Sequence, residues 1–267
     1  MLNSKTFAFI GAALAFGSLP AQADVSINAT TSGKASIINV GGEGVTRIKG
    51  NRLRTEQTVR GDPQVLIIDI DGRRFINLED KKRTAVVTPL DAIGEQLQKI
   101  VLPDIGATLE RTPEVKQVAG YPCTVHNVSM SFPFNLTGQA GQGMDVTMVM
   151  SGTVCLSTEV PGLADYQRFY KAAADSGFIF GDPRAAKSPT GAAQARAYAA
   201  LTRKMAEAGM ALESHINISA SGGGPMAAMM AGLAKSNIVT TVTQVTEGDL
   251  DASAFDIPAG YKVKTQN

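Results

Sequence analysis

The sequence predicts one α+β domain made of many antiparallel strands with a few inserted helices. Three observations predict this class. Short segments with alternating apolar residues recur along most of the chain, as in half-buried strands. Dipeptides typical of hairpins join several of these segments, which indicates antiparallel neighbours. A few other segments space their apolar residues as helices do, and they are inserted among the strands.

The first third of the chain predicts a meander of strands. Gly41-Gly42 is expected to form a turn, and Gly50-Asn51 and Asp71-Gly72 are expected to form hairpin turns. The expected strands cover residues 25–34, 45–49, 52–59, 64–70, 73–78 and 84–88. Apolar side chains of the hairpin around Asp71-Gly72 are expected to face the core, namely Leu66, Ile68, Ile70, Ile76 and Leu78.

Two apolar-alternating segments, residues 122–132 and 144–156, carry the only two cysteines and flank a glycine-rich loop. An antiparallel hairpin folded about residue 139 places Cys123 opposite Cys155, near disulfide reach. We therefore predict a disulfide, with two separately buried thiols as the alternative. Because side chains alternate between the faces of a strand, the same register predicts an apolar face opposite the cysteines. Its pairs are Val128 with Met150, Met130 with Met148, and Phe132 with Val146.

The remaining elements are predicted from apolar spacing and from helix-ending residues. Further strands are expected over residues 108–118, 210–220 and 237–246, with a loop over 178–189. Helices are expected over residues 90–102 and from Leu163 to an end at Gly177. A long alanine-rich helix is expected to be capped by Thr190 and closed by Gly209. The glycines at 222–224 predict a hinge before another helix. Its apolar residues follow a helical spacing, at Met226, Met229, Met230 and Leu233.

The N-terminus predicts a secretory signal peptide over residues 1–23. Lys5 precedes an apolar run that is shorter than a spanning helix needs, and Ala21-Gln22-Ala23 resembles a cleavage site. We expect residues 24–267 to form one soluble, exported domain without a transmembrane segment, in the periplasm, where a disulfide can persist. Cleavage removes one of 25 basic residues and leaves 24 against 24 acidic residues, which argues against a nucleic-acid partner.

Three stretches carry a resemblance to a known family. They are residues 47–56, the hairpin 66–78 with Lys81-Lys82-Arg83 after it, and the ending 255–261. With the export signal, they make the chain similar to the periplasmic lipoprotein-carrier-like (LolA/LolB-like) superfamily, within which it looks closest to a branch of exported proteins with no assigned activity. The resemblance implies a large antiparallel sheet curved into a half-open barrel, with inserted helices covering the concave face.

Motifs that carry chemistry are weak in this sequence. The Asp69-Ile70-Asp71-Gly72 stretch lacks the further oxygen ligands of a calcium loop, so a hairpin turn is the better interpretation. The glycines at 222–224 lack the lysine of a P-loop, and the chain has no Gly-x-Ser-x-Gly elbow. His126 is expected to pack in a strand, and His215 also falls in a strand. We therefore predict a non-enzyme that needs no metal or cofactor.

Nine basic residues cluster in the first meander. They predict either a patch for lipid headgroups or an acidic partner, or a solvated outer sheet face, which the interleaved Glu56, Glu79 and Asp80 favour. The nine are Arg47, Lys49, Arg52, Arg54, Arg73, Arg74, Lys81, Lys82 and Arg83.

The methionines suggest an adaptable apolar surface, because methionine is flexible and polarizable. The leading hypothesis is an exported, non-enzymatic protein that binds a hydrophobic ligand, such as a lipid or acyl chain, in the half-barrel. Its candidate ligand-binding residues are Met130, Met148, Met150, Met226, Met229, Met230 and Leu233. Ordinary core packing is the alternative for the methionine helix. The rival function is an envelope sensor or interaction module that binds a protein partner and no small molecule.

Overall fold

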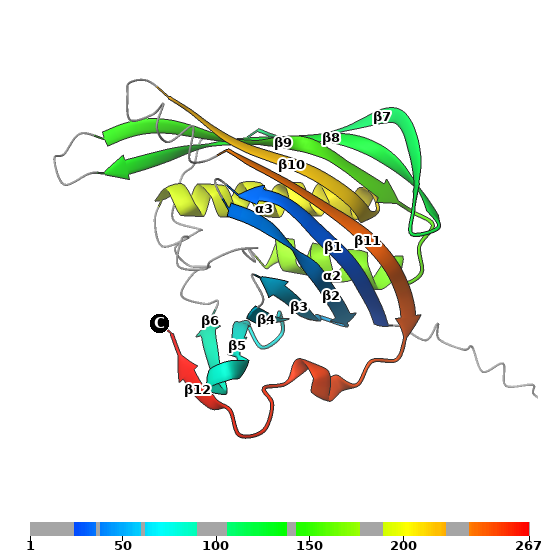
Figure 1. The fold of residues 1–267 in the computed structure, drawn as a ribbon, viewed down its shortest axis with the longest axis vertical. Helices are drawn as coiled ribbons and strands as arrows, with labels where there is room; N and C mark the ends of the chain where they lie inside the picture. Colours follow the sequence, from blue (N-terminus) through cyan, green and yellow to red (C-terminus); the bar gives the residue numbers. More distant parts are fainter. Residues whose placement is uncertain are drawn as a thin grey trace, which may run out of the picture.

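Twelve strands form one large curved sheet in this protein (Figure 1). The structure is a computed structural model, and it describes residues 24–35, 38–59, 62–89, 106–137, 143–176, 189–222 and 235–266. The predicted signal peptide, the helix expected at 90–102, the loop expected at 178–189 and the helix carrying Met226 to Leu233 lie outside these residues or almost entirely so.

The sheet follows the chain order except at two places. Its order is β12-β6-β5-β4-β3-β2-β1-β11-β10-β9-β8-β7, and it does not close on itself. All neighbours are antiparallel apart from β12, which pairs in parallel with β6. The α+β class is therefore confirmed, as one open, curved antiparallel sheet with helices added.

The strands agree with the predicted segments along most of the chain. The first six are β1 (Asp24–Ala35), β2 (Ile38–Lys49), β3 (Arg52–Val59), β4 (Asp62–Asp69), β5 (Arg74–Glu79) and β6 (Thr84–Pro89). The other six are β7 (Ala107–Val118), β8 (Tyr121–Thr137), β9 (Gly143–Ser157), β10 (Met210–Gly222), β11 (Ser236–Gly248) and β12 (Lys262–Thr265). The turn expected at Gly41-Gly42 is wrong, since both glycines lie inside β2 and pair with β1.

Two α-helices and two short 3-10 helices complete the described elements. They are α2 (Leu163–Asp175), α3 (Pro189–Ala208), η1 (Asp80–Lys82) and η3 (Ala252–Phe255). Because α3 begins at Pro189, Thr190 lies within its first turn and is not the cap; proline suits a first helical position since its missing N–H has no partner to lose there. The predicted end at Gly209 is confirmed.

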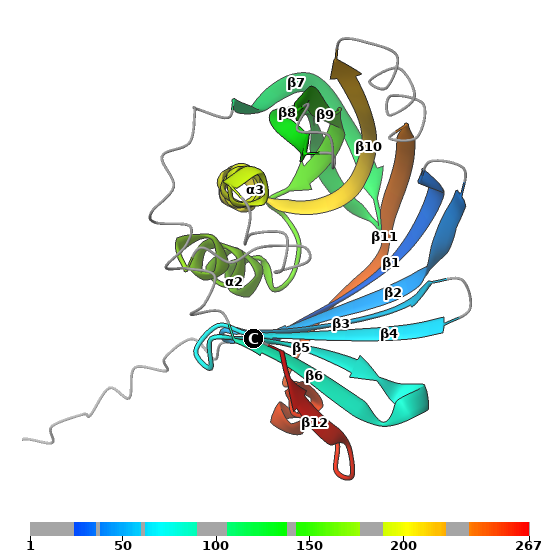
Figure 2. The same ribbon diagram turned by 90° about the vertical axis from the view of Figure 1, so that its left-hand side faces the viewer.

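Both helices lie on the inner side of the curve of the sheet (Figure 2). We call this side the inner face and the opposite side the outer face. Helix α2 contacts β1, β2 and β10, whereas α3 contacts β7, β8, β9 and β10. On the outer face of β4–β6, the chain after β11 supplies Ile257 and Tyr261, which pack against buried Ile67 and Ile76.

The second hairpin buries apolar side chains on both of its faces. Ile68, Ile70, Ile76 and Leu78 are buried and Leu66 packs against the core, as predicted. The register pairs Leu66 with Asn77 and Ile68 with Phe75. Ile76 and Leu78 therefore point to the outer face, under the C-terminal chain. Both faces can be apolar because this chain covers the outer one.

The β8–β9 hairpin contains the predicted disulfide, with the two Cα atoms 5.3 Å apart. The predicted register is wrong by two residues, because Cys155 pairs with Val125 and Met130 with Met150. A shift of two residues keeps every side chain on its face, so apolar alternation could not distinguish the two registers. The prediction of opposite faces is confirmed, since Met130 and Met150 pack in a cluster that excludes both cysteines.

A close approach between β9 and β10 requires Gly152. A Cβ atom on this residue would lie 1.8 Å from the carbonyl oxygen of His215 in the neighbouring strand. Gly152 pairs with Val128 on one side and Ile216 on the other, in the strongly curved part of the sheet. The absence of a side chain there lets the strands keep their ladder as the sheet bends.

Candidate functional site

The methionines of the central hairpin lie beneath α3. Met130 is fully buried, Met150 is buried, and both pack in a cluster with Ala197 and Leu201 of α3. Met148 is partly buried against the same cluster. The helix therefore occupies the inner face of β7–β10. The other four predicted ligand-binding residues, Met226, Met229, Met230 and Leu233, lie outside the described residues, so their role stays a prediction.

A hollow opens instead on the inner face of β3–β5, beside α2. Its volume is about 220 Å³. We call it the inner-face hollow. Its lining is mostly apolar, and none of the nine described residues around it is charged. They are Leu53, Thr55, Gln57, Gln64, Val65, Leu66, Ile68, Asn77 and Tyr170.

Strand alternation explains why this hollow carries no charge. Leu53, Thr55 and Gln57 occupy alternate positions of β3 and point inward, while the intervening positions hold Arg52, Arg54 and Glu56. Those charged side chains lie on the outer face. There, Arg54 donates to Glu56 across 2.7 Å, and the Arg52 guanidinium lies 5.4 Å from the centre of the Phe255 ring. The strand thus separates charge from the inner surface.

Tyr170 forms the wall of the hollow on the helix side. Its ring centre lies 4.5 Å from that of Tyr166 and 5.3 Å from that of Phe169, which meets it edge-on. Burial raises the pKa of Tyr170 above its ordinary value. The phenol therefore stays neutral across the physiological range, and the hollow offers a ligand an uncharged environment.

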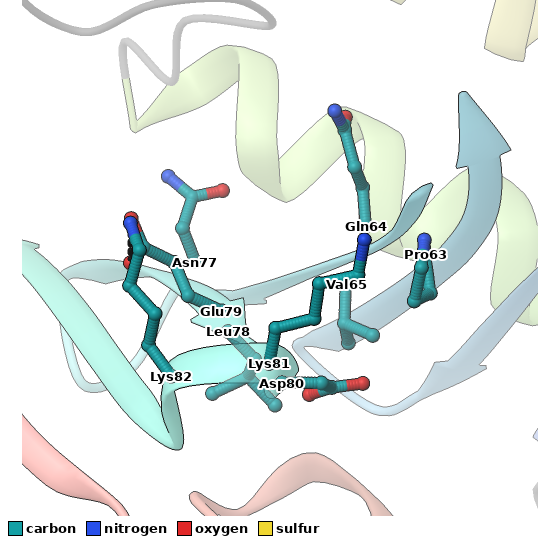
Figure 3. A pocket seen from close by; sticks show the side chains of 9 residues that line it. All are labelled: Pro63, Gln64, Val65, Asn77, Leu78, Glu79, Asp80, Lys81 and Lys82. Atoms are coloured by element: carbon teal, nitrogen blue, oxygen red, sulfur yellow. Dashed lines mark hydrogen bonds and ion pairs between the residues drawn. The ribbon is translucent and has the colours of Figure 1, made fainter. Parts of the chain in front are cut away.

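A second space adjoins the hollow at the ends of β4 and β5. Its volume is about 480 Å³, and it is closed on one side by η1 (Figure 3). Gln64, Val65 and Asn77 line both spaces. In Figure 3 the side chains of Gln64 and Asn77 point toward α2, away from those of Val65 and Leu78. We call the four charged residues of this space, Glu79, Asp80, Lys81 and Lys82, the charged rim.

The charged rim is tied to the C-terminal chain. Lys82 pairs with Glu79 at 3.0 Å, with both side chains largely exposed. The hydroxyl of Tyr261 donates to Asp80 across 2.6 Å, and this hydrogen bond raises the pKa of Tyr261. Tyr261 also packs against the apolar cluster on the outer face. The C-terminal chain therefore contacts both the outer face of the sheet and Asp80 of the charged rim.

The nine basic residues of the first meander all have partners. Arg83 donates to the carbonyl oxygen of Ala259, and neither Arg73 nor Lys81 lacks a partner. Carboxylates pair with the other six, which are Arg47, Lys49, Arg52, Arg54, Arg74 and Lys82. These pairs support the interpretation as a solvated, charge-compensated surface.

The two histidines hold structural contacts. His126 is nearly buried on the face of Val128 and Met130, as predicted, and its Nδ1 lies 2.9 Å from the carbonyl oxygen of Thr124. His215 lies 3.1 Å from Glu213, which also accepts from Lys116 at 2.9 Å. Among the described residues, no group of three or more His, Cys, Asp or Glu side chains is placed to hold a metal ion.

Asp69 explains the stretch that superficially resembles a calcium loop. Its carboxylate accepts from the backbone N–H of Gly72 at 2.8 Å and from Arg74 at 2.9 Å. Both oxygens therefore hold the turn between β4 and β5, which agrees with the hairpin interpretation.

The residues of the inner-face hollow were missed at the sequence level, although a signal existed. Residues 53, 55 and 57 pair with 68, 66 and 64, so the two hairpin registers already place them side by side on one face. All six side chains are uncharged, whereas the alternate face of β3 is charged. Tyr170 carried no such signal, because only the packing of α2 brings it there.

Comparisons with known proteins are remote. No family model matches the chain, and no curated protein matches it. One similar solved structure is an uncharacterized conserved protein from Thermus thermophilus, with 9% identity over 92% of each chain and a TM-score of 0.38. Another is a LolA superfamily protein from Nitrosomonas europaea, with 8% identity over 88% of this chain and 91% of that chain, and a TM-score of 0.29. The second belongs to the superfamily that the sequence resembles.

The described helices are too short or too polar to cross a bilayer: none combines the length and the apolar character that a spanning segment requires.

Proposed function

We propose that this protein is an exported, non-enzymatic protein that binds a hydrophobic ligand, such as a lipid or acyl chain, on the concave face of a half-open barrel. The observation that carries the proposal is the inner-face hollow, an uncharged and mostly apolar space between β3–β5 and Tyr170. In this proposal α2 and α3 cover the concave face, and the hollow is the part that they leave open to a ligand.

The size and chemistry of the hollow suit part of a chain. Its volume of about 220 Å³ lies below the range of roughly 300–1,000 Å³ that whole small molecules occupy. Each methylene transferred from water to such a surface contributes roughly 0.8 kcal/mol. A flexible chain can therefore gain affinity there in small increments, and its polar end must lie elsewhere.

The methionines extend this proposal. Met130, Met148 and Met150 continue the apolar inner face beneath α3. A longer chain reaches them only if α3 moves, and thioether side chains can repack around ligands of different length. The predicted methionine helix, with Met226, Met229, Met230 and Leu233, would then form an adjustable cover over the chain.

The test fills the hollow and leaves the rest of the sheet alone. Thr55→Trp places a large side chain among the lining residues, whereas Thr58→Trp places the same side chain at an exposed position three residues along β3, outside the lining. Both mature proteins are purified from the periplasm and analysed by native mass spectrometry with lipid extraction, then titrated with a single-chain monoacylglycerol.

We expect a co-purifying lipid mass and monoacylglycerol binding in the wild type and in Thr58→Trp, and a loss of both in Thr55→Trp. Equal binding by the two variants would reject the hollow as the site. A wild-type mass free of lipid, with no binding of the added probe, would reject the proposal and favour the interaction module.

A further inference from the structure

We infer that the charged rim binds a lipid headgroup that carries both a phosphate and an ammonium group, while the acyl chain enters the inner-face hollow. This inference rests on the proposed function and names the class of ligand. It is carried by two observations: the rim and the hollow share lining residues, and the rim presents equal numbers of positive and negative side chains.

The two spaces meet at the first residues of β4 and the last of β5. Gln64, Val65 and Asn77 line both of them. The hollow adds the uncharged side chains of β3 and Tyr170 to these three residues. The second space adds the residues of η1 (Figure 3). A molecule that spans both spaces must therefore have an apolar end and a charged end.

The volume of the rim space agrees with this division. At about 480 Å³ it is more than twice the size of the hollow. A headgroup with its first glycerol carbons is bulkier in cross-section than a single alkyl chain. The larger volume at the charged end and the smaller volume at the apolar end thus agree with the proportions of a single-chain phospholipid.

The charges of the rim distinguish between headgroups. Lys81 and Lys82 can donate to phosphate oxygens, and Glu79 and Asp80 can accept from an ammonium group. A headgroup with only a phosphate would bring its charge near two carboxylates, and one with only an ammonium would bring it near two lysines. A headgroup with both charges can form favourable contacts with the lysines through its phosphate and with the carboxylates through its ammonium group.

The rim can exchange its internal contacts for ligand contacts. The Lys82–Glu79 pair is exposed, with 74% and 43% of the two side chains accessible, and exposed pairs contribute little to stability. Asp80 is held by Tyr261 from the other side. One carboxylate is thus fixed in position, while Lys82 can exchange its exposed pair with Glu79 for a contact with a phosphate.

The experiment compares three single-chain probes with the same acyl chain, using the full mature protein. They are a lysophosphatidylethanolamine, a lysophosphatidylglycerol and a monoacylglycerol. We expect the first to bind about tenfold more tightly than the other two at low salt, since two charge-assisted contacts of ordinary strength supply about that factor. The preference should shrink as salt is raised.

Variants locate the effect. Lys81→Gln with Lys82→Gln should remove the advantage of lysophosphatidylethanolamine over monoacylglycerol, because the phosphate loses its donors, while monoacylglycerol binding stays unchanged. Lys262→Gln with Lys264→Gln, a matched loss of two exposed lysines on β12, should keep it. Glu79→Gln should strengthen lysophosphatidylglycerol binding by a few-fold, because it removes one carboxylate facing the phosphate.

The outcomes separate the two proposals. Equal affinity for all three probes, or an advantage over monoacylglycerol that survives Lys81→Gln with Lys82→Gln, would overturn the headgroup assignment and leave the hydrophobic site in place. Failure of every probe to bind would overturn the proposed function itself.

Discussion

The inner face of the sheet is packed against a helix in one half and partly open in the other. Across β7–β10, helix α3 packs on the apolar surface. Met130 of β8 and Leu201 of α3 are both buried in the cluster between the helix and the sheet. Across β3–β5, the inner face carries uncharged polar residues among the apolar ones and is left partly open. On this side the outer face is the more tightly covered one, by the chain that holds Ile257 and Tyr261.

The difference shows how one sheet can be stable and still leave part of its inner face uncovered. Each half needs at least one covered apolar face. In β7–β10, helix α3 packs on the inner face, so the apolar side chains of that face form part of the core. Where the C-terminal chain covers the outer face, the inner face of β3–β5 stays partly open. The stability of the open half should therefore depend on the C-terminal chain.

The largest expected effect tests this dependence. Phe255 in η3 is 1% exposed, and replacing such a buried phenylalanine by alanine costs roughly 3–5 kcal/mol. We expect Phe255→Ala to lower the free energy of unfolding by that amount in urea denaturation. Hydrogen exchange should accelerate in β3–β6 and stay unchanged in β8 and β9. Val263→Ala, at an exposed position of β12, serves as the control.

If exchange in β8 and β9 accelerated equally in Phe255→Ala, the two halves would unfold as one unit and the comparison would fail. The control should unfold like the wild type, since the Val263 side chain is 59% exposed.

The second test concerns the other half. The Cys123–Cys155 bridge closes a loop with a sequence separation of 32, and a cross-link of that length contributes roughly 3–4 kcal/mol by restricting the unfolded chain. The double variant Cys123→Ser with Cys155→Ser should lose about this much in urea denaturation. Ligand binding in the hollow should be unaffected, because the cysteines lie far along the sheet from β3–β5. Loss of binding in a folded variant would contradict the separation of the halves.

The smallest expected effect concerns α2, which contacts β10 and supplies Tyr170 to the hollow on β3–β5. Burial raises the pKa of Tyr166 to about 12, against a hydrogen bond with the backbone of Ala211 that lowers it. Its ordinary pKa in the unfolded chain is about 10. The folded state therefore holds the proton more strongly, so this stability is present below pH 10 and lost as the pH rises to 12.

The loss amounts to roughly 2–3 kcal/mol, and Tyr166→Phe should lose less stability than the wild type over the same pH window. At pH 7 the two should differ only by the lost hydrogen bond to Ala211. Parallel pH profiles for the two proteins would contradict the raised pKa of Tyr166 and the burial that causes it.

Local pattern was enough for much of the fold. Apolar alternation and turn dipeptides located nearly every described strand, because period-two burial and turn chemistry are properties of a few neighbouring residues. The disulfide between Cys123 and Cys155 and the packing of His126 were also predicted correctly. The same reasoning failed where two answers satisfy the local pattern equally, as in the two-residue shift of the β8–β9 register.

The sequence by itself determined the strands, their face-to-face alternation and the uncharged row formed by Leu53, Thr55 and Leu66. Only the tertiary structure decided that the helices pack on the inner face of the sheet and the C-terminal chain on the outer face. Nothing local to β4 and β5 indicates that residues beyond 250 cover their outer face, or that Tyr170 approaches their inner face from α2. Such contacts join segments that lie far apart in the sequence, and they depend on the packing of the whole chain.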